Sequence, residues 1–375
     1  MAAQPIYLDY QATTPLAPES LAAMQPWLGG PESISGWANP HSAHGPGRRA
    51  AAAVEVARGQ IEALMPPGGQ LIFTSGATEA LNLAIRGALP ALAPRRRIVT
   101  LATEHAAVRD TCLWLESQAH EVVLLPVGGD GLVDLDVARA AITTDTALVA
   151  AMLVNNEIGV IQPVEALAQM AHQAGALFLC DAVQGFGRAS LPQSADMIAI
   201  SAHKIHGPKG IGALWRRDGV ALEPLIHGGG QEQGLRSGTL SPALCAGFGA
   251  AARLAGEQME RDLAHVAMLQ KRALELFAGW QVNGSLEHRY AGNLNLRRDG
   301  LDVARLMSDV RRVAFSAGSA CASGSGRPSH VLTALGLPSA AVRSSIRLGF
   351  GRYTSVDEID RAAHLILDAA DRQIG

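Results

Sequence analysis

The sequence predicts an α/β fold, with a large domain built on a mostly parallel sheet flanked by helices and a smaller α+β domain. In the middle of the 375-residue chain, short apolar runs alternate with helical stretches. From about residue 242 this rhythm gives way to one long helical stretch, ending near residue 277, and then to shorter elements. The length also exceeds what one small core needs, so about two domains are expected.

The alternating elements follow one another in a regular order. The expected strands are residues 71–73, 97–101, 121–126, 147–154, 176–180, 197–201 and 211–215, and the expected helices between them include 77–89, 106–118 and 164–174. A β-α-β order predicts parallel pairing, with helices on both faces of the sheet. Such sheets bind ligands outside the carboxyl ends of their strands.

We expect residues 17–255 to form the large domain and residues 1–16 and 256–375 to form the small one. Within the small domain, the segment 316–329 is rich in glycine and serine, which is typical of a surface loop. This loop carries Cys321.

Composition excludes several classes of function. Hydrophobic residues make up 48% and charged residues 17%, the balance of a folded globular chain, and the net charge of −3 gives no attraction to nucleic acid or anionic lipid. No apolar stretch approaches the roughly 20 residues of a membrane span, and the N-terminus has no secretory signal pattern. We therefore expect a cytoplasmic protein without membrane or direct nucleic-acid partners. The four cysteines lack CxxC spacing, so no metal site is expected.

Lysines are rare in this chain, which narrows the search for a reactive amine. Only Lys204, Lys209 and Lys271 occur. Lys204 follows the strand 197–201, where a lysine amine can form a Schiff base with an aldehyde cofactor. Lys271 lies on the long helix and Lys209 in a glycine-rich turn, so Lys204 is the best candidate. The alternative is an ordinary surface lysine.

Two other strand ends carry polar groups suited to a cofactor. In FTSGATEALNL, Gly76 permits close backbone approach and the following helix begins with free N–H groups, which attract phosphate. Asp181 ends the strand 176–180, where a carboxylate can keep a pyridine nitrogen protonated. At both places an ordinary helix cap is the alternative.

Three further residues are ambiguous on their own. His105 begins a helix and can stack on a flat ring or move protons, although a plain helix-start hydrogen bond is the simpler interpretation. Arg347 suits a substrate carboxylate or a structural salt bridge. Cys321 lies in the glycine-rich loop and is either reactive or a tolerated surface cysteine, whereas helices or strands hold the other thiols, Cys112, Cys180 and Cys245.

Together these segments resemble the NifS/IscS-type cysteine desulfurases, which are class-V, fold-type I enzymes dependent on pyridoxal 5'-phosphate. The resemblance runs through nearly the whole chain. In order, it covers YLDYQATTP, NPHSAHGPG, FTSGATEALNL, TEH, VNNEIGV, DAVQGFG, SAHKIHGPKGIGAL, HGGGQEQGLRSGTL, SAGSACASGSGRPSHVLTALG and SSIRLGFGR. Gln11 and Ala317 depart from the residues expected at their positions.

The resemblance assigns cofactor roles to residues of this chain. It implies that Lys204 binds the cofactor covalently, that Asp181 pairs with the pyridine nitrogen, that His105 stacks on the ring and that Gln184 contacts the phenolic oxygen. The implied phosphate site comprises Gly76, Ala77, Thr78, Ser201 and His203, together with Thr239 of the partner subunit in a homodimer.

The resemblance also implies the reaction. Asn156 and Arg347 bind L-cysteine, Cys321 takes its sulfur as a persulfide, and L-alanine leaves. The sulfur then passes to an acceptor protein, for example in iron–sulfur cluster assembly. An aminotransferase or selenocysteine lyase would share the cofactor but would not require the Cys321 thiol. A cofactor-free partner protein would not need Lys204 and Asp181.

Overall fold

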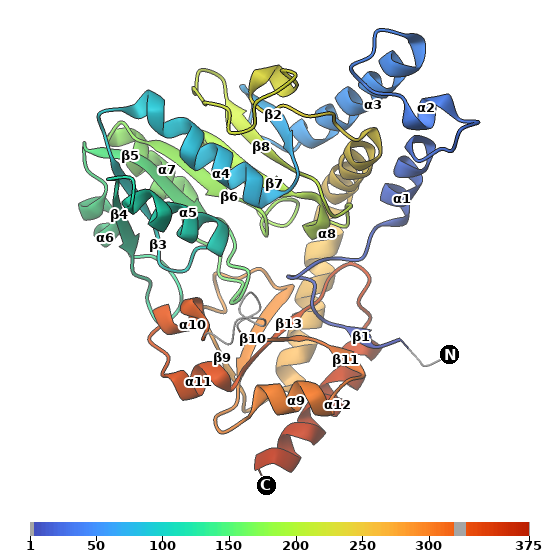
Figure 1. The fold of residues 1–375 in the computed structure, drawn as a ribbon. Coiled ribbons are helices and arrows are strands. Elements are labelled where there is room, and N and C mark those ends of the chain that lie inside the picture. The colour runs from blue at the N-terminus through green and yellow to red at the C-terminus, as the bar shows by residue number, and fades with distance from the viewer. Residues whose placement is uncertain (1–3, 319–327, 375) are drawn as a thin grey trace.

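The computed structural model describes residues 4–318 and 328–374, and its largest element is a seven-stranded sheet in the order β2-β8-β7-β6-β5-β3-β4 (Figure 1). The strands are β2 (Gly69–Thr74), β3 (Arg97–Leu101), β4 (Glu121–Leu125), β5 (Thr146–Met152), β6 (Leu177–Asp181), β7 (Met197–Ser201) and β8 (Gly212–Arg217). Strands β4, β3, β5, β6 and β7 pair in parallel, whereas β8 is antiparallel to both β2 and β7. The predicted mostly parallel sheet is therefore confirmed.

Helices cover both faces of this sheet, because its central strands are apolar on both sides. Every residue of β5 is buried. Helices α4 (Ala77–Ala88) and α5 (Ala106–Glu116) pack on one face and share one hydrophobic core with the sheet. Helix α7 (Val164–Gln173) packs on the other face, in a core that extends to the second sheet. The short α6 (Leu135–Ala141) lies beside β4 and α7.

A second, smaller sheet has the order β12-β13-β10-β9 and lies below the large sheet in Figure 1. Its strands are β9 (Gln281–Val282), β10 (Asn293–Arg297), β12 (Ser316–Ala317) and β13 (Ser345–Gly349). The helices of this region are α9 (Val303–Asp309), α10 (His330–Ala334), α11 (Ser339–Arg343) and α12 (Val356–Ile374). The 35-residue helix α8 (Pro242–Leu276) runs between the two halves of the molecule, contacting both α3 (Gly45–Glu62) and α12.

The N-terminal segment ties the two halves together. Strand β1 (Ile6–Tyr7) pairs with β11 (Val313–Ala314), and Asp9 bridges to Gly349 beside the small sheet. The chain then crosses to the large sheet, where it continues into α1 (Pro18–Met24) and α2 (Ile34–Trp37). The predicted division at residue 255 falls inside the continuous helix α8 and stays a prediction.

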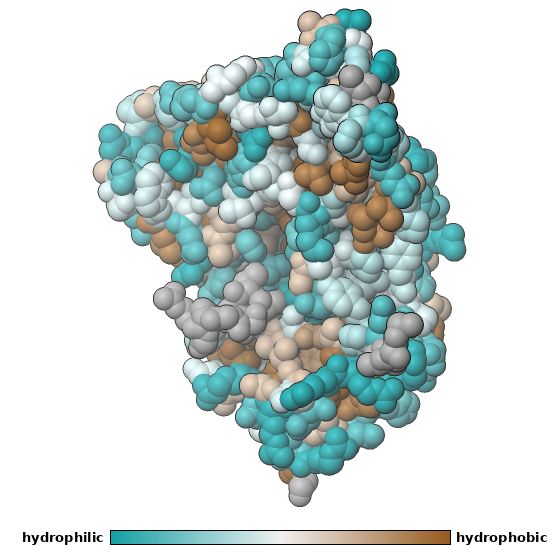
Figure 2. Space-filling view, turned by 45° about the vertical axis from the view of Figure 1, so that its right-hand side comes forward, coloured by the Kyte–Doolittle hydropathy of each residue, from teal (hydrophilic) through white to brown (hydrophobic). Residues whose placement is uncertain are grey.

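The sequence located most elements of the large sheet to within a few residues. The expected strand 147–154 ends earlier, at Met152, because Val154 instead forms an isolated bridge with Ile161 across a tight turn. Helices α1 to α3 were not anticipated. Among the described residues, no helix is both long and apolar enough to cross a membrane. The face shown in Figure 2 is largely hydrophilic, with separate hydrophobic patches.

Close backbone packing beside α4 gives a first prediction. A Cβ atom at Gly212 would lie 2.7 Å from the Gly76 carbonyl carbon and 2.7 Å from the Ile200 oxygen, closer than real Cβ contacts allow. Gly212→Ala should therefore destabilise the protein by roughly 1–3 kcal/mol, because rigid backbone must move. Equilibrium denaturation measures the change.

Gly59→Ala is the matched control, since a Cβ there meets nothing within 4 Å on helix α3. It should be neutral or stabilising by up to about 1 kcal/mol, because alanine favours helix. Equal stabilities for the two alanine variants would contradict the close-approach argument.

Candidate active site

A cavity of about 690 Å³ opens at the carboxyl ends of the central strands, where an α/β sheet is expected to bind its ligand. It brings together residues from distant parts of the chain. Its lining includes the predicted site residues Gly76, Ala77, Thr78, His105, Asn156, Asp181, Gln184, Ser201, His203, Lys204 and Arg347. Thr239 is exposed outside it, and Cys321 lies outside the described residues.

One wall of the cavity is the N-terminus of α4. Gly76 is the N-cap residue and offers no side-chain acceptor to the helix, so the first N–H groups face the cavity uncapped. Ser201 lies at the end of β7 and lines the same cavity. N–H groups of this kind, the partial positive charge of the helix end and a nearby hydroxyl form a site suited to an anion.

Asp181 ends β6 inside the cavity and is 5% exposed. Burial raises the pKa of its carboxyl, while the Val183 N–H bond of 2.9 Å and the positive charge of Lys204 act in the opposite direction. A buried carboxyl of this kind is stabilised in its ionised form by a cation placed against it. A protonated ring nitrogen is such a cation.

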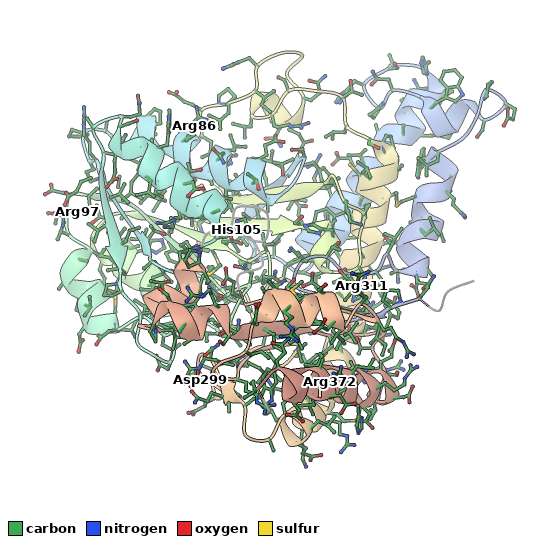
Figure 3. All side chains as sticks on the ribbon, turned by 60° about the horizontal axis from the view of Figure 1, so that its bottom comes forward. Arg86, Arg97, His105, Asp299, Arg311 and Arg372 are labelled. Atoms are coloured by element: carbon green, nitrogen blue, oxygen red, sulfur yellow. The ribbon has the colours of Figure 1, made fainter. Side chains whose placement is uncertain are left out.

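His105 caps the N-terminus of α5, and Figure 3 marks it in the middle of the molecule. Its Nδ1 accepts the Ala107 N–H at 3.1 Å, so the helix-start hydrogen bond expected for this histidine is confirmed. Burial is the main cause that lowers the pKa of the ring, so the ring is neutral near pH 7 and carries its proton on Nε2. The hydrogen bond thus fixes both the tautomer and the orientation of the ring.

The amine of Lys204 is held by the N-terminal segment. Its Nζ donates to the carbonyl oxygens of Gln11 and Ala12, the latter at 2.9 Å. The Gln184 amide also donates to the Gln11 oxygen, at 2.9 Å. These contacts use main-chain oxygens. They are therefore independent of the Gln11 side chain, which departs from the residue expected at that position.

His203 lies next to Lys204 and is half-buried. Burial first, and then the positive charges of Lys204, Lys209 and Arg188, lower its pKa to about 4. Its Nδ1 lies 3.2 Å from the Thr13 hydroxyl. A neutral imidazole here can donate a hydrogen bond to an anion without adding charge.

Arg347, on β13, is 1% exposed although it lines the cavity. Its Nη1 donates to the Asn156 carbonyl oxygen at 2.9 Å, and its Nη2 forms an ion pair with Asp9 at 2.6 Å. The structural salt bridge considered for this arginine therefore exists. The Nε–H group is buried without a partner among the described residues.

The three described cysteines are poor nucleophiles. Cys112, Cys180 and Cys245 are all buried, and burial raises the pKa of Cys112 and of Cys245 to about 12. The reactive form of a thiol is the thiolate, which such groups do not reach near neutral pH. None of the three described thiols is therefore suited to act as a nucleophile.

Sequence reasoning missed three acidic residues around the site. Asp9 pairs with Arg347, Glu157 accepts the Ser329 hydroxyl at 2.5 Å, and Glu104 is fully buried with its Oε1 accepting the Met152 N–H at 2.8 Å. All three lie inside the segments YLDYQATTP, VNNEIGV and TEH, in which only the neighbouring residues were singled out. Burial raises the pKa of Glu104 well above its usual range.

Comparison with known proteins shows the family of this chain. The Aminotransferase class-V family model matches residues 6–362, so the chain belongs to that family. Cysteine desulfurase IscS of Rickettsia bellii is 43% identical over 374 residues, covering 96% of this chain and 90% of that protein. Among solved structures, a NifS-like protein superposes with a TM-score of 0.90 at 30% identity, covering 98% of this chain and all of the other.

A third relative is a structure described as SspA in complex with cysteine, with a TM-score of 0.81 at 36% identity, covering 93% of this chain and 99% of the other. Within the class-V family, the chain is therefore a cysteine desulfurase.

The buried carboxyl of Glu157 gives a pH prediction. Burial raises its pKa to about 7, partly opposed by Ser329 and Arg347, whereas an unfolded glutamate titrates near pH 4.3. Between these values the folded state binds more protons than the unfolded state, so this carboxyl lowers stability as pH rises. Relative to Glu157→Gln, the wild type should lose roughly 2–3 kcal/mol between pH 5 and pH 8.

Denaturation at both pH values measures this difference. Glu116→Gln makes the same chemical change at an exposed position on α5 and should track the wild type. Parallel stability–pH curves for the wild type and Glu157→Gln would show that Glu157 does not titrate as described.

Proposed function

We propose that this chain removes sulfur from L-cysteine with pyridoxal 5'-phosphate bound in the cavity, giving L-alanine and a persulfide on Cys321. The observation that carries the proposal is that one cavity gathers Lys204, Asp181, His105 and Arg347 in a member of the cysteine desulfurases. Each of these side chains has a contact that suits a separate part of the reaction.

The residues present fit this cofactor. The uncapped start of α4, with Gly76, Ala77 and Thr78, and the side chains of Ser201 and His203 would hold its phosphate. Asp181 would face the ring nitrogen, His105 the ring, Gln184 the phenolic oxygen, and Lys204 would be the covalent attachment point. When bound, the cofactor supplies an electron sink for the substrate's α-carbon.

Arg347 and Asn156 would bind the substrate. The Arg347 guanidinium lines the cavity and would give the substrate carboxylate a charge-assisted hydrogen bond in a buried setting. The Asn156 carbonyl holds Nη1 of the same guanidinium and so limits its rotation. Together these residues fix which side of the amino acid faces Lys204.

Proton transfer would fall to Lys204 and His105. The Lys204 amine takes the proton from the substrate's α-carbon, and the nearby Gln11 and Ala12 carbonyls hold this amine in place. His105 is neutral with its proton on Nε2, so it can hydrogen-bond or exchange a proton at that atom. Its Nδ1 is occupied by the helix N–H and takes no part.

Sulfur transfer would require Cys321. Its thiolate attacks the substrate sulfur, an S–S bond forms, the C–S bond breaks, and the carbon keeps the electron pair and takes a proton before leaving as L-alanine. We further propose that the persulfide sulfur passes to an acceptor protein, such as a scaffold for iron–sulfur clusters, in the cytoplasm. The Rickettsia bellii relative is named as a cysteine desulfurase, which supports the sulfur-removal step.

The proposal includes a homodimer. The loop carrying Thr239 is held by two ion pairs at 2.7 Å, Arg58–Glu232 and Arg236–Glu79, so an exposed Thr239 is presented outward in a fixed position. Exposed apolar side chains also occur in the N-terminal region that contains α1, α2 and α3, at the upper right of Figure 1, namely Leu21, Leu28, Trp37 and Val56. Such a surface favours contact with a second chain.

Cys321→Ser tests the reaction, because it keeps the size of the side chain but removes the sulfur nucleophile. The variant should retain the yellow cofactor and still change its spectrum with L-cysteine. Release of sulfide and alanine under reducing conditions should fall at least about a hundredfold. Cys112→Ser or Cys245→Ser should keep most of the turnover, apart from packing losses. Wild-type turnover by Cys321→Ser would support a lyase-type reaction instead.

Thr239→Ala tests the shared phosphate site. Loss of one hydrogen bond to a charged group should weaken cofactor retention by roughly tenfold, measured by dialysis and absorbance. Thr144→Ala changes an exposed threonine elsewhere and should keep wild-type retention. A stable monomer with full cofactor and activity would overturn the dimer proposal.

A further inference from the structure

We propose that Asp9 is a positioning residue, which holds the Arg347 guanidinium in the orientation that receives the substrate carboxylate. The inference rests on the proposed substrate role of Arg347. Asp9 itself does not line the cavity, so it acts through the arginine.

The contacts around the guanidinium define this role. Asp9 Oδ1 lies 2.6 Å from Nη2 of Arg347, and the same oxygen accepts the Ser316 hydroxyl at 2.9 Å. The Asn156 carbonyl takes Nη1 at 2.9 Å. Protein groups thus hold two of the three guanidinium nitrogens, Asn156 from the cavity wall and Asp9 from outside the cavity lining.

The two contacts leave other N–H groups of the guanidinium for a ligand. A guanidinium has five N–H donors in a rigid planar fork. Nε–H is buried and has no partner among the described residues. Nη1 and Nη2 each carry a second N–H, and Arg347 lines the cavity, so a carboxylate there can meet this fork. With Asp9 fixing Nη2, the plane of the fork and the directions of its N–H groups are set before the ligand arrives.

The charge of Asp9 also lowers the cost of keeping Arg347 in place. Arg347 is 1% exposed, and an isolated buried cation is unfavourable unless an anion compensates it. Glu157 adds a second acidic group acting on the same guanidinium, but the Asp9 contact is the direct one.

Asp9 further connects this arginine to the amine of Lys204. Its backbone oxygen accepts the N–H of Ala12 at 3.0 Å, which begins the turn that presents the Gln11 and Ala12 carbonyls to Lys204. The side chain of Asp9 therefore orients the carboxylate end of the site, and its main chain contributes to the amine end. Only the first role depends on the Asp9 charge.

Asp9→Asn tests this role, since it keeps the side-chain shape and the turn but removes the charge. In the full-length, cofactor-loaded enzyme, KM for L-cysteine should rise about tenfold while kcat stays within about twofold. The calorimetric Kd of L-alanine, which carries the carboxylate but no sulfur, should rise by the same factor. Inhibition by ethylamine, which lacks the carboxylate, should not change.

Two further variants separate positioning from general stability. Asp262→Asn breaks a comparable ion pair, Arg352–Asp262 at 2.6 Å, and should leave KM unchanged. In an Arg347→Lys background, Asp9→Asn should add little to KM, because the two residues act as one unit. Unchanged L-alanine affinity in Asp9→Asn, or equal weakening of L-alanine and ethylamine, would overturn the proposal.

The L-alanine measurement also keeps this inference distinct from the proposed function. If the wild type binds L-alanine in an Asp9-dependent way but releases no sulfide from L-cysteine, the desulfurase reaction fails and the Asp9 role stands. If sulfide is released but Asp9→Asn alters neither KM nor L-alanine affinity, the reaction stands and the Asp9 role fails.

Discussion

The parallel register of β5, β6 and β7 is the constraint on which the site depends. Backbone pairing places Met152 opposite Asp181, and Asp181 opposite Ala199, so neighbouring strands end at one edge of the sheet. The chain that leaves each strand there carries a different functional group. A slip in this register would move Asp181 away from Ser201 and Lys204, because strand partners alternate faces residue by residue.

The antiparallel strand β8 places the start of α4 at the same edge of the sheet. It pairs with β7 and β2, and the close approach of Gly212 to Gly76 lets the start of α4 lie beside the end of β7. The anion site and the lysine that follows β7 are thus held together by backbone packing. Side chains contribute chemistry there, but the backbone sets the distance between them.

Around this edge, burial determines the charge states. Burial lowers the pKa values of His105 and His203, so both rings are neutral, and it raises the pKa values of Cys112, Cys180 and Cys245. Burial also raises the pKa of Asp181, which the charge of Lys204 opposes. The N-terminal segment supplies the compensating groups, with carbonyls for Lys204 and a carboxylate for Arg347. One short segment therefore joins the sheet edge to the small sheet that carries Arg347.

By itself, the sequence determined the strand and helix order, the carboxyl-edge position of Asp181 and Lys204, and the placement of Cys112, Cys180 and Cys245 in helices or strands. These features follow from local apolar periodicity and from the scarcity of lysine, both of which can be read along the chain. Only the tertiary structure decided which residues contact the side chains of Lys204 and Arg347. Lys204 meets a carbonyl 193 positions away and Arg347 meets a carboxylate 338 positions away, and local pattern carries no information about such pairs. Local pattern also carries no information about the pKa values of Glu104 and Glu157. Burial raises both values, and this burial results from the packing of the whole chain.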